Sequence, residues 1–357
     1  MKPRSGWKFS RTALFLLVLL VAFTISPVQA HHCKGPHASD PACGGGGGGG
    51  SVPPDPVIVY VAVASSGPYN ELAVANADGS NQTALLSSEE VGYFFPAWSP
   101  DLDPDTPGYQ GSVVFEQWSG PVDTPTIDLW LIDLDGCLAG EIACNERELV
   151  KNASSPAWSP NGHLLAYVSH ADDYSKRGIR IRDLSSGPDP ADILLIPDPT
   201  PDNVQNVNWP AWNPLGTHLA YSLIDGSSEE VRVREVLDEN DALISNGTDS
   251  LIVSDASGAR GLDWSRGGGF LAFKAAGAMQ TVDLTIFPLQ MRSLPESTWT
   301  ESPTWMPANE SELIFMNRNG RSGAGKRKIV KRNLETDAEA VIVERNGFHL
   351  YEPDWRR

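Results

Sequence analysis

The sequence PAWSP occurs at residues 96–100 and again at residues 156–160, and PAWNP occurs at residues 210–214. Weaker copies are LDWS at residues 262–265, PTWMP at residues 303–307 and PDW at residues 353–355. The tryptophans of these six motifs are 60, 54, 52, 41 and 50 residues apart: Trp98, Trp158, Trp212, Trp264, Trp305 and Trp355. A period of this size that carries strand-like sequence is typical of a β-propeller, with one blade per repeat.

Short strand-like segments, bounded by Gly, Pro, Asn or Asp, follow each tryptophan. After Trp158 they are residues 164–168 (LLAYV), residues 179–183 (IRIRD) and residues 193–196 (ILLI). The first segment is apolar throughout, as expected of a strand buried on both faces between neighbouring blades, and the next alternates, as expected nearer the rim. No stretch after residue 30 keeps helical spacing of apolar residues over three turns. The pattern therefore predicts blades of four strands each.

The last tryptophan, Trp355, has a first strand but no later strands after it. Segments in the missing order occur at the other end of the chain, at residues 57–63, 71–75 and 83–86. We therefore expect an all-β fold: a six-bladed β-propeller with four-stranded blades, in which the N- and C-terminal strands share one blade. Closing the ring in this way leaves few exposed sheet edges.

The repeat resembles those of TolB-type six-bladed propellers in its Pro-x-Trp-Ser-Pro-(Asp/Asn)-Gly turn, its apolar and alternating strands and its Asp-Gly-Ser-Asn turn at residues 78–81. The resemblance covers residues 56–357 and weakens at residues 266–269, where RGGG replaces the turn. TolB carries an α/β domain before its propeller, and this chain resembles the propeller half alone. Similar propellers precede the hydrolase domain of prolyl-oligopeptidase-type enzymes, and we expect no such domain here. The resemblance implies a face that docks an envelope lipoprotein.

Residues 1–30 have the pattern of a secretory signal: a basic start, an apolar stretch at residues 14–25 and VQA at residues 28–30. The apolar stretch is too short for a comfortable membrane span. The expected organisation is a signal peptide at residues 1–30, a Cys/His head and Gly-rich linker at residues 31–55, and the propeller at residues 56–357. We predict an exported protein, periplasmic or extracellular, without a membrane span.

The charge of the chain is strongly negative, with a formal net charge of -18 at pH 7. Removing residues 1–30 deletes four positive charges and no negative ones, which gives about -22. A protein surface this acidic disfavours binding to nucleic acid. The partner that we expect is a protein or peptide of the cell envelope, bound by a monomer.

Four cysteines form two local pairs, Cys33 with Cys43 and Cys137 with Cys144, and we predict that both pairs are disulfides in an exported protein. The first pair lies among His31, His32 and His37, so the head contains five potential ligands for zinc or copper. Their spacing matches no standard structural zinc site. A disulfide-looped tail without metal is the alternative, and we expect no cofactor.

Two other motifs carry charge. Residues 320–326 (GRSGAGK) satisfy Gly-x4-Gly-Lys, but Arg327 replaces the Mg²⁺-binding Ser/Thr and a strand follows, so we interpret them as a hairpin loop. Around them, residues 318–332 form a basic patch, which is either a solvated hairpin or a contact for an anion or acidic partner. Residues 101–105 (DLDPD) are either a Ca²⁺ site or an acidic turn, and they lack the glycine and distal Glu of an EF-hand.

Enzyme signatures are few. Neither Gly-x-Ser-x-Gly nor His-Glu-x-x-His occurs, and His163 and His218 occupy the same place in successive repeats, where we expect a blade surface. The leading hypothesis is a non-catalytic binding module. The alternative is a carbohydrate-active or hydrolytic enzyme with its site in the propeller channel.

The residues just before each Pro-x-Trp begin the innermost strand, and the resemblance implies that they face the channel mouth. The candidates for contact with a partner are Phe94, Phe95, Ser155, Trp209, Arg260, Glu301, Tyr351 and Glu352. Aromatic residues and Arg are common anchors of protein interfaces. The alternative is that these residues are strand starts packed under neighbouring loops. We expect five of the repeat tryptophans to be core residues between blades: Trp98, Trp158, Trp212, Trp305 and Trp355.

Overall fold

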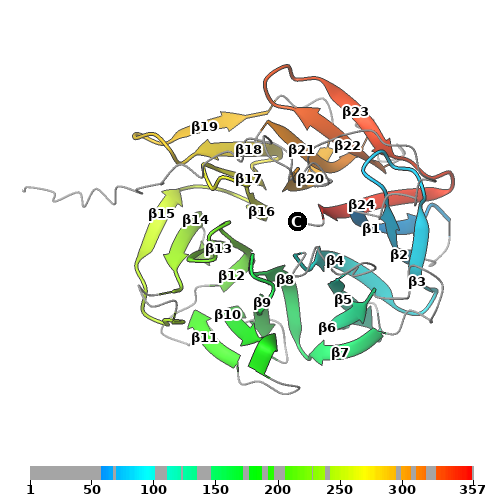
Figure 1. Ribbon diagram of the computed structural model, residues 1–357, viewed down its shortest axis with the longest axis horizontal. Helices are drawn as coiled ribbons and strands as arrows, with labels where there is room; N and C mark the ends of the chain where they lie inside the picture. Colours follow the sequence, from blue (N-terminus) through cyan, green and yellow to red (C-terminus); the bar gives the residue numbers. More distant parts are fainter. Residues whose placement is uncertain are drawn as a thin grey trace, which may run out of the picture. The chain divides into compact units, whose positions relative to one another are not determined.

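Six four-stranded antiparallel sheets are arranged in a ring, with their first strands toward the centre (Figure 1). The computed structural model describes residues 58–66, 70–100, 111–121, 124–134, 146–171, 177–186, 192–196, 206–226, 228–237, 242–294, 299–306, 311–318 and 327–355. All of them belong to the unit Pro53–Arg357. The described residues are almost entirely strand, with one 3₁₀ turn at Leu184–Ser186. The prediction of an all-β, six-bladed propeller is confirmed.

The blades are numbered here from the shared one. Blade 1 contains β24 (Phe348–Trp355), β1 (Ile58–Ala64), β2 (Asn70–Ala75) and β3 (Thr83–Ser88), and blade 2 contains β4 (Gly92–Trp98), β5 (Ser112–Ser119), β6 (Thr126–Asp133) and β7 (Glu146–Val150). Blade 3 contains β8 (Ala153–Trp158), β9 (Leu164–His170), β10 (Arg177–Asp183) and β11 (Asp192–Ile196), and blade 4 contains β12 (Asn206–Trp212), β13 (His218–Asp225), β14 (Ser228–Glu235) and β15 (Asp249–Val253). Blade 5 contains β16 (Arg260–Trp264), β17 (Phe270–Ala275), β18 (Ala278–Asp283) and β19 (Gln290–Ser293), and blade 6 contains β20 (Trp299–Trp305), β21 (Glu312–Arg318), β22 (Arg327–Asn333) and β23 (Glu339–Val343).

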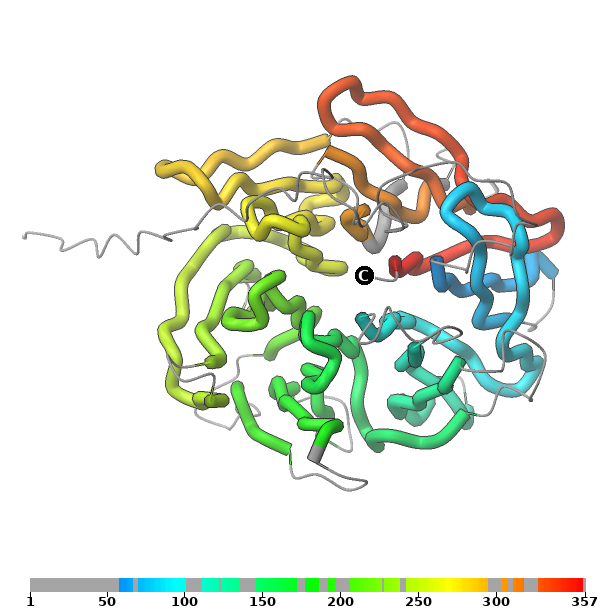
Figure 2. The backbone as a smooth tube through the Cα atoms, in the orientation of Figure 1, coloured from blue at the N-terminus to red at the C-terminus, as the bar shows by residue number. Residues whose placement is uncertain are grey.

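The ring closes through blade 1, where strands from the two ends of the chain lie side by side (Figure 2). Strand β24 pairs antiparallel with β1, from Ile58 opposite Trp355 to Ala64 opposite Phe348. The innermost strands contact one another in the order β24, β4, β8, β12, β16, β20 and back to β24. The predicted shared blade is therefore confirmed.

An aromatic residue lies at the centre of the second strand in every blade. These six residues, all fully buried, are Tyr60, Phe115, Tyr167, Tyr221, Phe273 and Phe315. Because each blade packs its faces against two neighbours, a second strand has no solvent face, and apolar residues fill both sides of it. The sequence pattern of apolar second strands has this origin.

The repeat tryptophans pack between blades, as predicted for Trp98, Trp212, Trp305 and Trp355, and Trp264, for which no prediction was made, is buried as well. Trp98, Trp212, Trp264, Trp305 and Trp355 are each at most 7% exposed. The prediction is only partly right for Trp158, which is half-buried. Four of the indoles also donate Nε1–H to a backbone carbonyl of the preceding blade: Trp158 to Ala97, Trp212 to Ala157, Trp264 to Ala211 and Trp305 to Asp263, each at 3.1 Å. Each of these four motifs thus joins two blades through its tryptophan.

The polar residue after the tryptophan closes the turn to the second strand. Ser159 Oγ accepts the N–H of Leu164 at 2.9 Å, and Ser265 Oγ accepts the N–H of Phe270 at 3.0 Å. In blade 4, Asn213 Oδ1 takes the same role for His218 at 2.9 Å. This recurring bond explains why Ser or Asn follows Trp in the motif.

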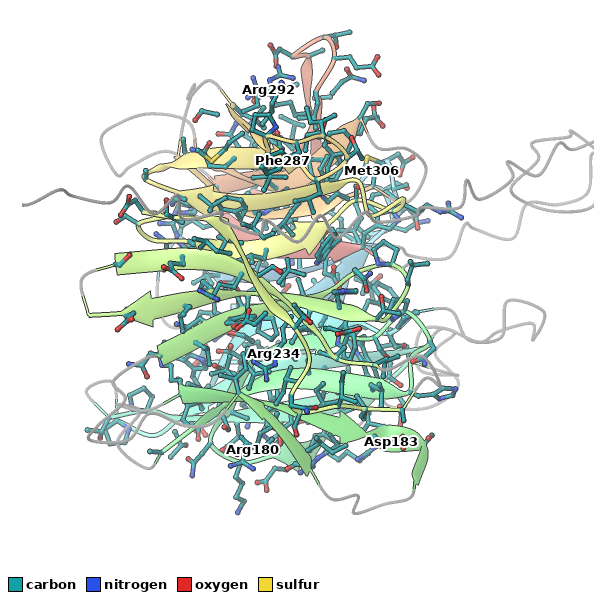
Figure 3. All side chains as sticks on the ribbon, turned by 90° about the vertical axis from the view of Figure 1, so that its left-hand side faces the viewer. Arg180, Asp183, Arg234, Phe287, Arg292 and Met306 are labelled. Carbon is teal, nitrogen blue, oxygen red and sulfur yellow. The ribbon has the colours of Figure 1, made fainter. Side chains whose placement is uncertain are left out.

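Ion pairs and exposed side chains lie at the rim, on the outer strands. Figure 3 looks onto this edge from the side of blades 4 and 5, with Arg234 on β14 and Phe287 and Arg292 in blade 5. Phe287, in the turn between β18 and β19, is 84% exposed. None of the described helical segments is long and apolar enough to cross a membrane.

Candidate functional site

The channel contains a cavity of about 490 Å³, lined by all six innermost strands. Its wall is made of the tryptophan motifs, of the residue before the motif in blades 1 to 5, and of residues that follow the tryptophan, such as Pro100 and Arg266. The volume lies within the range of small-ligand sites, roughly 300 to 1,000 Å³.

Every innermost strand contains a β-bulge. The two bulged residues are the one just before the tryptophan motif and the first residue of the motif. In blade 2, Phe94 pairs with Glu116 and Ala97 pairs with Val114, so that Phe95 and Pro96 together lie opposite the single residue Phe115. The same two-against-one arrangement occurs in the other five blades, always opposite the buried aromatic of the second strand. Proline has no N–H to donate, and a bulge is one of the few places where a sheet accommodates it.

The bulge places its first residue in the left-handed region of backbone conformation. The φ angles are 45° at Phe95, 50° at Ser155, 57° at Trp209, 60° at Gly261 and 49° at Glu352. All five of these residues line the cavity. Only glycine adopts such angles freely, and non-glycine residues there cost about 1 to 2 kcal/mol each. Backbone strain at functional sites often serves to orient a side chain, and here it coincides with the channel wall.

Two of these side chains meet inside the ring. The rings of Phe95 in blade 2 and Trp209 in blade 4 pack edge to face, with their centroids 4.8 Å apart. Blade 3, which lies between them, contributes only Ser155 at the equivalent position, so the two large rings have room to touch. Phe94 packs against Trp118, with a centroid distance of 4.8 Å, and extends the aromatic surface. Phe95 and Trp209 are both half-buried, so part of each ring stays accessible.

Carboxylates hold the bulges and motifs of neighbouring blades together. Glu352 Oε2 accepts the N–H of Phe95 at 2.6 Å, and Asp354 Oδ2 accepts the N–H of Trp98 at 2.7 Å. In blade 5, Asp263 Oδ2 accepts the N–H of Trp305 at 2.7 Å. Bonds from ordered N–H groups to a carboxylate are charge-assisted, and they fix the position of the carboxylate.

Glu116 makes the same kind of link from the second strand of blade 2. Its Oε1 accepts the N–H of Ser155 at 2.8 Å, and its Oε2 accepts Trp118 Nε1–H at 2.7 Å. The side chain is fully buried, and burial raises the pKa of Glu116 to about 7, although these two hydrogen bonds and the charge of Arg177 lower it. Glu116 therefore titrates near neutral pH at a junction between blades.

A second polar group adjoins that junction in blade 3. His170 Nε2 and Ser154 Oγ are 2.7 Å apart, and Arg177 donates from Nη1 to Asn208 Oδ1 at 2.6 Å. Burial and, to a lesser extent, the charge of Arg177 lower the pKa of His170 to about 4. His170 is therefore neutral at physiological pH.

Solved structures of similar architecture include two TolB proteins. The structure of TolB from Acinetobacter baumannii matches with a TM-score of 0.61 at 18% identity, over 85% of this chain and 67% of that chain. A putative TolB from Agrobacterium tumefaciens matches with a TM-score of 0.55 at 12% identity, over 85% of this chain and 99% of that chain. The chain has the TolB-like propeller fold.

Other comparisons are less specific. A prolyl endopeptidase structure matches the TolB-like propeller with a TM-score of 0.46 at 18% identity, over 82% of this chain and 43% of that chain. No protein-family model and no curated protein matches the chain.

The TolB-like propeller brings four of the eight predicted contact residues together in the cavity wall: Phe95, Ser155, Trp209 and Glu352. The others lie outside the lining. Phe94 packs on Trp118, Arg260 is exposed, and Tyr351 lies beneath the guanidinium of Arg327, 4.2 Å from its ring centroid. Glu301 pairs with Met316 through the backbone of β20.

The basic patch of the TolB-like propeller is largely paired with acidic neighbours where it is described. Lys328 lies 2.8 Å from Glu344, Lys331 lies 3.4 Å from Glu312, and Arg332 bonds Glu339 at 3.2 Å. The positive charge of these three residues is therefore already matched by neighbouring carboxylates, and Arg332 is buried rather than solvated. His163 is exposed as predicted, whereas His218 is half-buried, with its Nδ1 2.9 Å from Thr217 Oγ1.

The remaining predicted sites lie outside the described residues: the four cysteines, the head histidines, residues 101–105 and residues 320–326. Their disulfide and metal assignments stay predictions. Among the described residues, no three His, Cys, Asp or Glu side chains are grouped as metal ligands.

Sequence reasoning missed Glu116 and the carboxylates of the motifs themselves, Asp263 and Asp354. The signal was present, because the middle residue of Pro-x-Trp is Ala in blades 2 to 4 and changes to Asp263, Thr304 and Asp354 in blades 5, 6 and 1. Thr304 Oγ1 donates to the carbonyl of Pro353 at 3.0 Å. The polar residues at the middle motif position in blades 5, 6 and 1 therefore all form a hydrogen bond to a neighbouring blade.

Proposed function

We propose that this chain is an exported, non-catalytic propeller that binds a protein or peptide of the cell envelope through its channel face. The observation that carries the proposal is the Phe95–Trp209 pair in the cavity wall, 4.8 Å between centroids. Large aromatic side chains, held rigidly in a concave site, are typical anchors for a partner. The strained bulges hold the two rings in place before binding, which reduces the entropy lost on association.

The proposals of export and of an envelope partner are supported by different observations. The secretory pattern of residues 1–30 supports export, and the resemblance to TolB-type repeats supports a docking role in the envelope. The net charge of -18 supports a partner other than nucleic acid.

A hydrolytic or carbohydrate-active enzyme is the second candidate. It is favoured by the Ser154–His170 contact of 2.7 Å, which has the geometry of a nucleophile and its base. Against it, the adjacent N–H of Ser155 already donates to Glu116, so it does not serve as an oxyanion donor. Ser154 and His170 also lie outside the cavity lining. Covalent labelling of Ser154 by a fluorophosphonate would favour this second candidate.

The test of the binding role is capture from envelope extract by the chain without residues 1–30. The affinity tag belongs at the N-terminal side, because β24 closes the ring near the C-terminus. We expect Trp209→Ala to lose most of the capture while the melting temperature changes little, since Trp209 is half-buried. Phe287→Ala is the matched control, because it removes an aromatic ring that is 84% exposed and lies in the turn between β18 and β19. If Trp209→Ala captures as well as the unmodified chain, the channel face is not the binding surface.

A further inference from the structure

One buried carboxyl group is connected to the whole aromatic side of the cavity. Blades 2, 3 and 4 are consecutive around the ring and contribute Phe95, Ser155 and Trp209 at the left-handed bulge position. Glu116, on the second strand of blade 2, is fully buried. Its interactions lead to each of these three bulge residues by a different route.

The first route is a direct hydrogen bond to blade 3. Glu116 Oε1 accepts the N–H of Ser155 at 2.8 Å. Ser155 lies in the bulge, out of register with β9, and lines the cavity between the blades that carry Phe95 and Trp209. The carboxyl therefore holds the backbone directly beside the aromatic pair.

The second route is a series of ring contacts in blade 2. Glu116 Oε2 accepts Trp118 Nε1–H at 2.7 Å, and the ring of Trp118 packs on Phe94 with centroids 4.8 Å apart. The rings of Phe94 and Phe95 are 6.5 Å apart, and Phe95 contacts Trp209 at 4.8 Å. Aromatic contacts thus continue from the carboxyl to the far member of the pair.

The third route is electrostatic and reaches blade 4. The charge of Arg177 acts on Glu116 and lowers its pKa. Arg177 also donates from Nη1 to Asn208 Oδ1 at 2.6 Å, and Asn208 directly precedes Trp209 in the chain. A change of charge at Glu116 therefore acts, through one side chain, on the residue next to Trp209.

We propose that Glu116 is a positioning residue for the Phe95–Trp209 pair and couples the position of the two rings to the binding of one proton. An ionised carboxyl accepts both N–H groups, which is the arrangement in the structure. A protonated carboxyl has an O–H donor in place of one acceptor, so either Ser155 or Trp118 loses its bond and the rings move. The inference adds a regulation to the proposed function, on which it rests only for its effect on a partner.

The environment of Glu116 sets the pH at which this change occurs. Burial raises the pKa to about 7, and the bonds from Ser155 and Trp118 and the charge of Arg177 oppose that rise. Because burial favours the neutral form and the three partners favour the charged form, both forms are populated near neutral pH.

Other ionisable groups on the surrounding strands are Asp128 on β6, His170 on β9 and Arg177 on β10. Strand β8 has none, and the one on β4, Tyr93, packs edge to face on Phe115. His170 is neutral at physiological pH, because its pKa is lowered to about 4. A transition near pH 7 that disappears when the carboxyl is replaced is therefore assigned to the carboxyl itself.

The first arm of the test follows two rings by ¹⁹F NMR of the chain without residues 1–30, labelled with 5-fluorotryptophan. The substitutions Trp118→Phe and Trp209→Phe assign the two signals, because each removes one of them. We expect both signals to shift with a common midpoint near pH 7. A Trp209 signal that stays constant from pH 6 to pH 8 would overturn the proposal.

The variant Glu116→Gln keeps the size of the side chain and one acceptor oxygen but does not titrate. It should abolish the transition and hold the Trp209 signal near its low-pH position, because the amide resembles the protonated carboxyl. The control, Glu89→Gln, makes the same exchange at an exposed residue between β3 and β4 and should leave the transition unchanged. A transition that survives Glu116→Gln would belong to another group and would refute the proposal.

Trp118→Phe tests the coupling while Glu116 stays in place. The phenyl ring still packs on Phe94, but the N–H that bonds the carboxyl is gone. Since that bond lowers the pKa of Glu116, its loss should move the midpoint of the Trp209 signal to higher pH. An unchanged midpoint would show that the bond does not set the state of the pair and would contradict the proposal.

The last arm measures capture from envelope extract at pH 6 and pH 8. The unmodified chain should bind at most about tenfold more weakly at pH 6, because one pH unit on each side of the midpoint changes the ionised fraction by that factor. Any pH dependence that remains with Glu116→Gln comes from the partner. Equal pH dependence in the two chains would refute an effect of Glu116 on binding.

The inference and the proposed function can fail separately. A Trp209 signal that titrates with Glu116, without any captured protein, retains the positioning role and counts against an envelope partner. Capture that depends on Trp209, with a Trp209 signal that does not change with pH, retains the binding face and refutes the positioning role.

Discussion

At the scale of single residues, Glu116 combines full burial, a role in joining two blades and a pKa raised to about 7. In the unfolded chain its pKa is near the ordinary glutamate value, about 4.3. Between these two values the folded protein holds a proton that the unfolded chain has released. The group therefore contributes most to stability below pH 4.3, and its contribution falls as the pH rises to 7.

The corresponding prediction concerns Glu116→Gln, which keeps an acceptor for the N–H of Ser155 but does not titrate. The difference in unfolding free energy between the variant and the unmodified chain should shift in favour of the variant as the pH rises from 4 to 8. The expected size of the shift is about 3 kcal/mol. His170 titrates in both proteins and cancels from the difference. Denaturant titrations at several pH values measure it, and a difference independent of pH would contradict the account.

The repeat tryptophans give a second prediction at this scale. Trp212 is 3% exposed, whereas Trp158 is half-buried, although each donates Nε1–H to the preceding blade. Trp212→Ala should therefore cost roughly 3 to 5 kcal/mol of unfolding free energy, and Trp158→Ala clearly less. Thermal and denaturant unfolding of the two variants makes the comparison, which fails if the costs are equal or reversed.

At the scale of the element, the innermost strand is defined by its bulge. Glycine occupies the left-handed position in blade 5, at Gly261, and serine occupies it in blade 3, at Ser155. The same backbone conformation is thus adopted by a residue that favours it and by one that does not. The left-handed conformation could not be predicted from the sequence. The Pro-x-Trp motif indicates where a strand begins but not the sign of φ at the residue before it.

Reciprocal substitutions test the strain. Ser155→Gly should stabilise the protein by up to about 1 kcal/mol, and Gly261→Ala should destabilise it by about 1 kcal/mol. Ser155→Ala is the control, because it removes the hydroxyl without changing the backbone preference. Shifts of the same sign in the two glycine exchanges would argue against a common strained position.

Sequence reasoning was most successful for the elements. The tryptophan period and the apolar second strands predict the strands, their order and the shared blade, because these depend on burial patterns that repeat along the chain. The cavity wall was harder to predict. Contacts such as Phe95 with Trp209 and Glu352 with Phe95 join blades that are far apart in sequence, and their partners become visible only when the ring is closed.

At the scale of the whole molecule, stability depends on closure of the ring through blade 1. Strand β24 pairs with β1 and also holds blade 2 through Glu352 and Asp354. Deleting residues 351–357 should therefore remove most of the cooperative unfolding transition, which calorimetry can record. A truncated chain that melts like the full-length chain would refute the shared blade as the closing element.

The central claim is that a partner sits on the channel face of the ring. The most direct measurement is oxidative footprinting of the chain with and without its captured partner, read out residue by residue. The account predicts strong protection of Phe95 and Trp209 and unchanged oxidation of Phe287, which is 84% exposed on the rim. Protection of Phe287 with unchanged oxidation of Trp209 would place the partner on the rim and contradict the account.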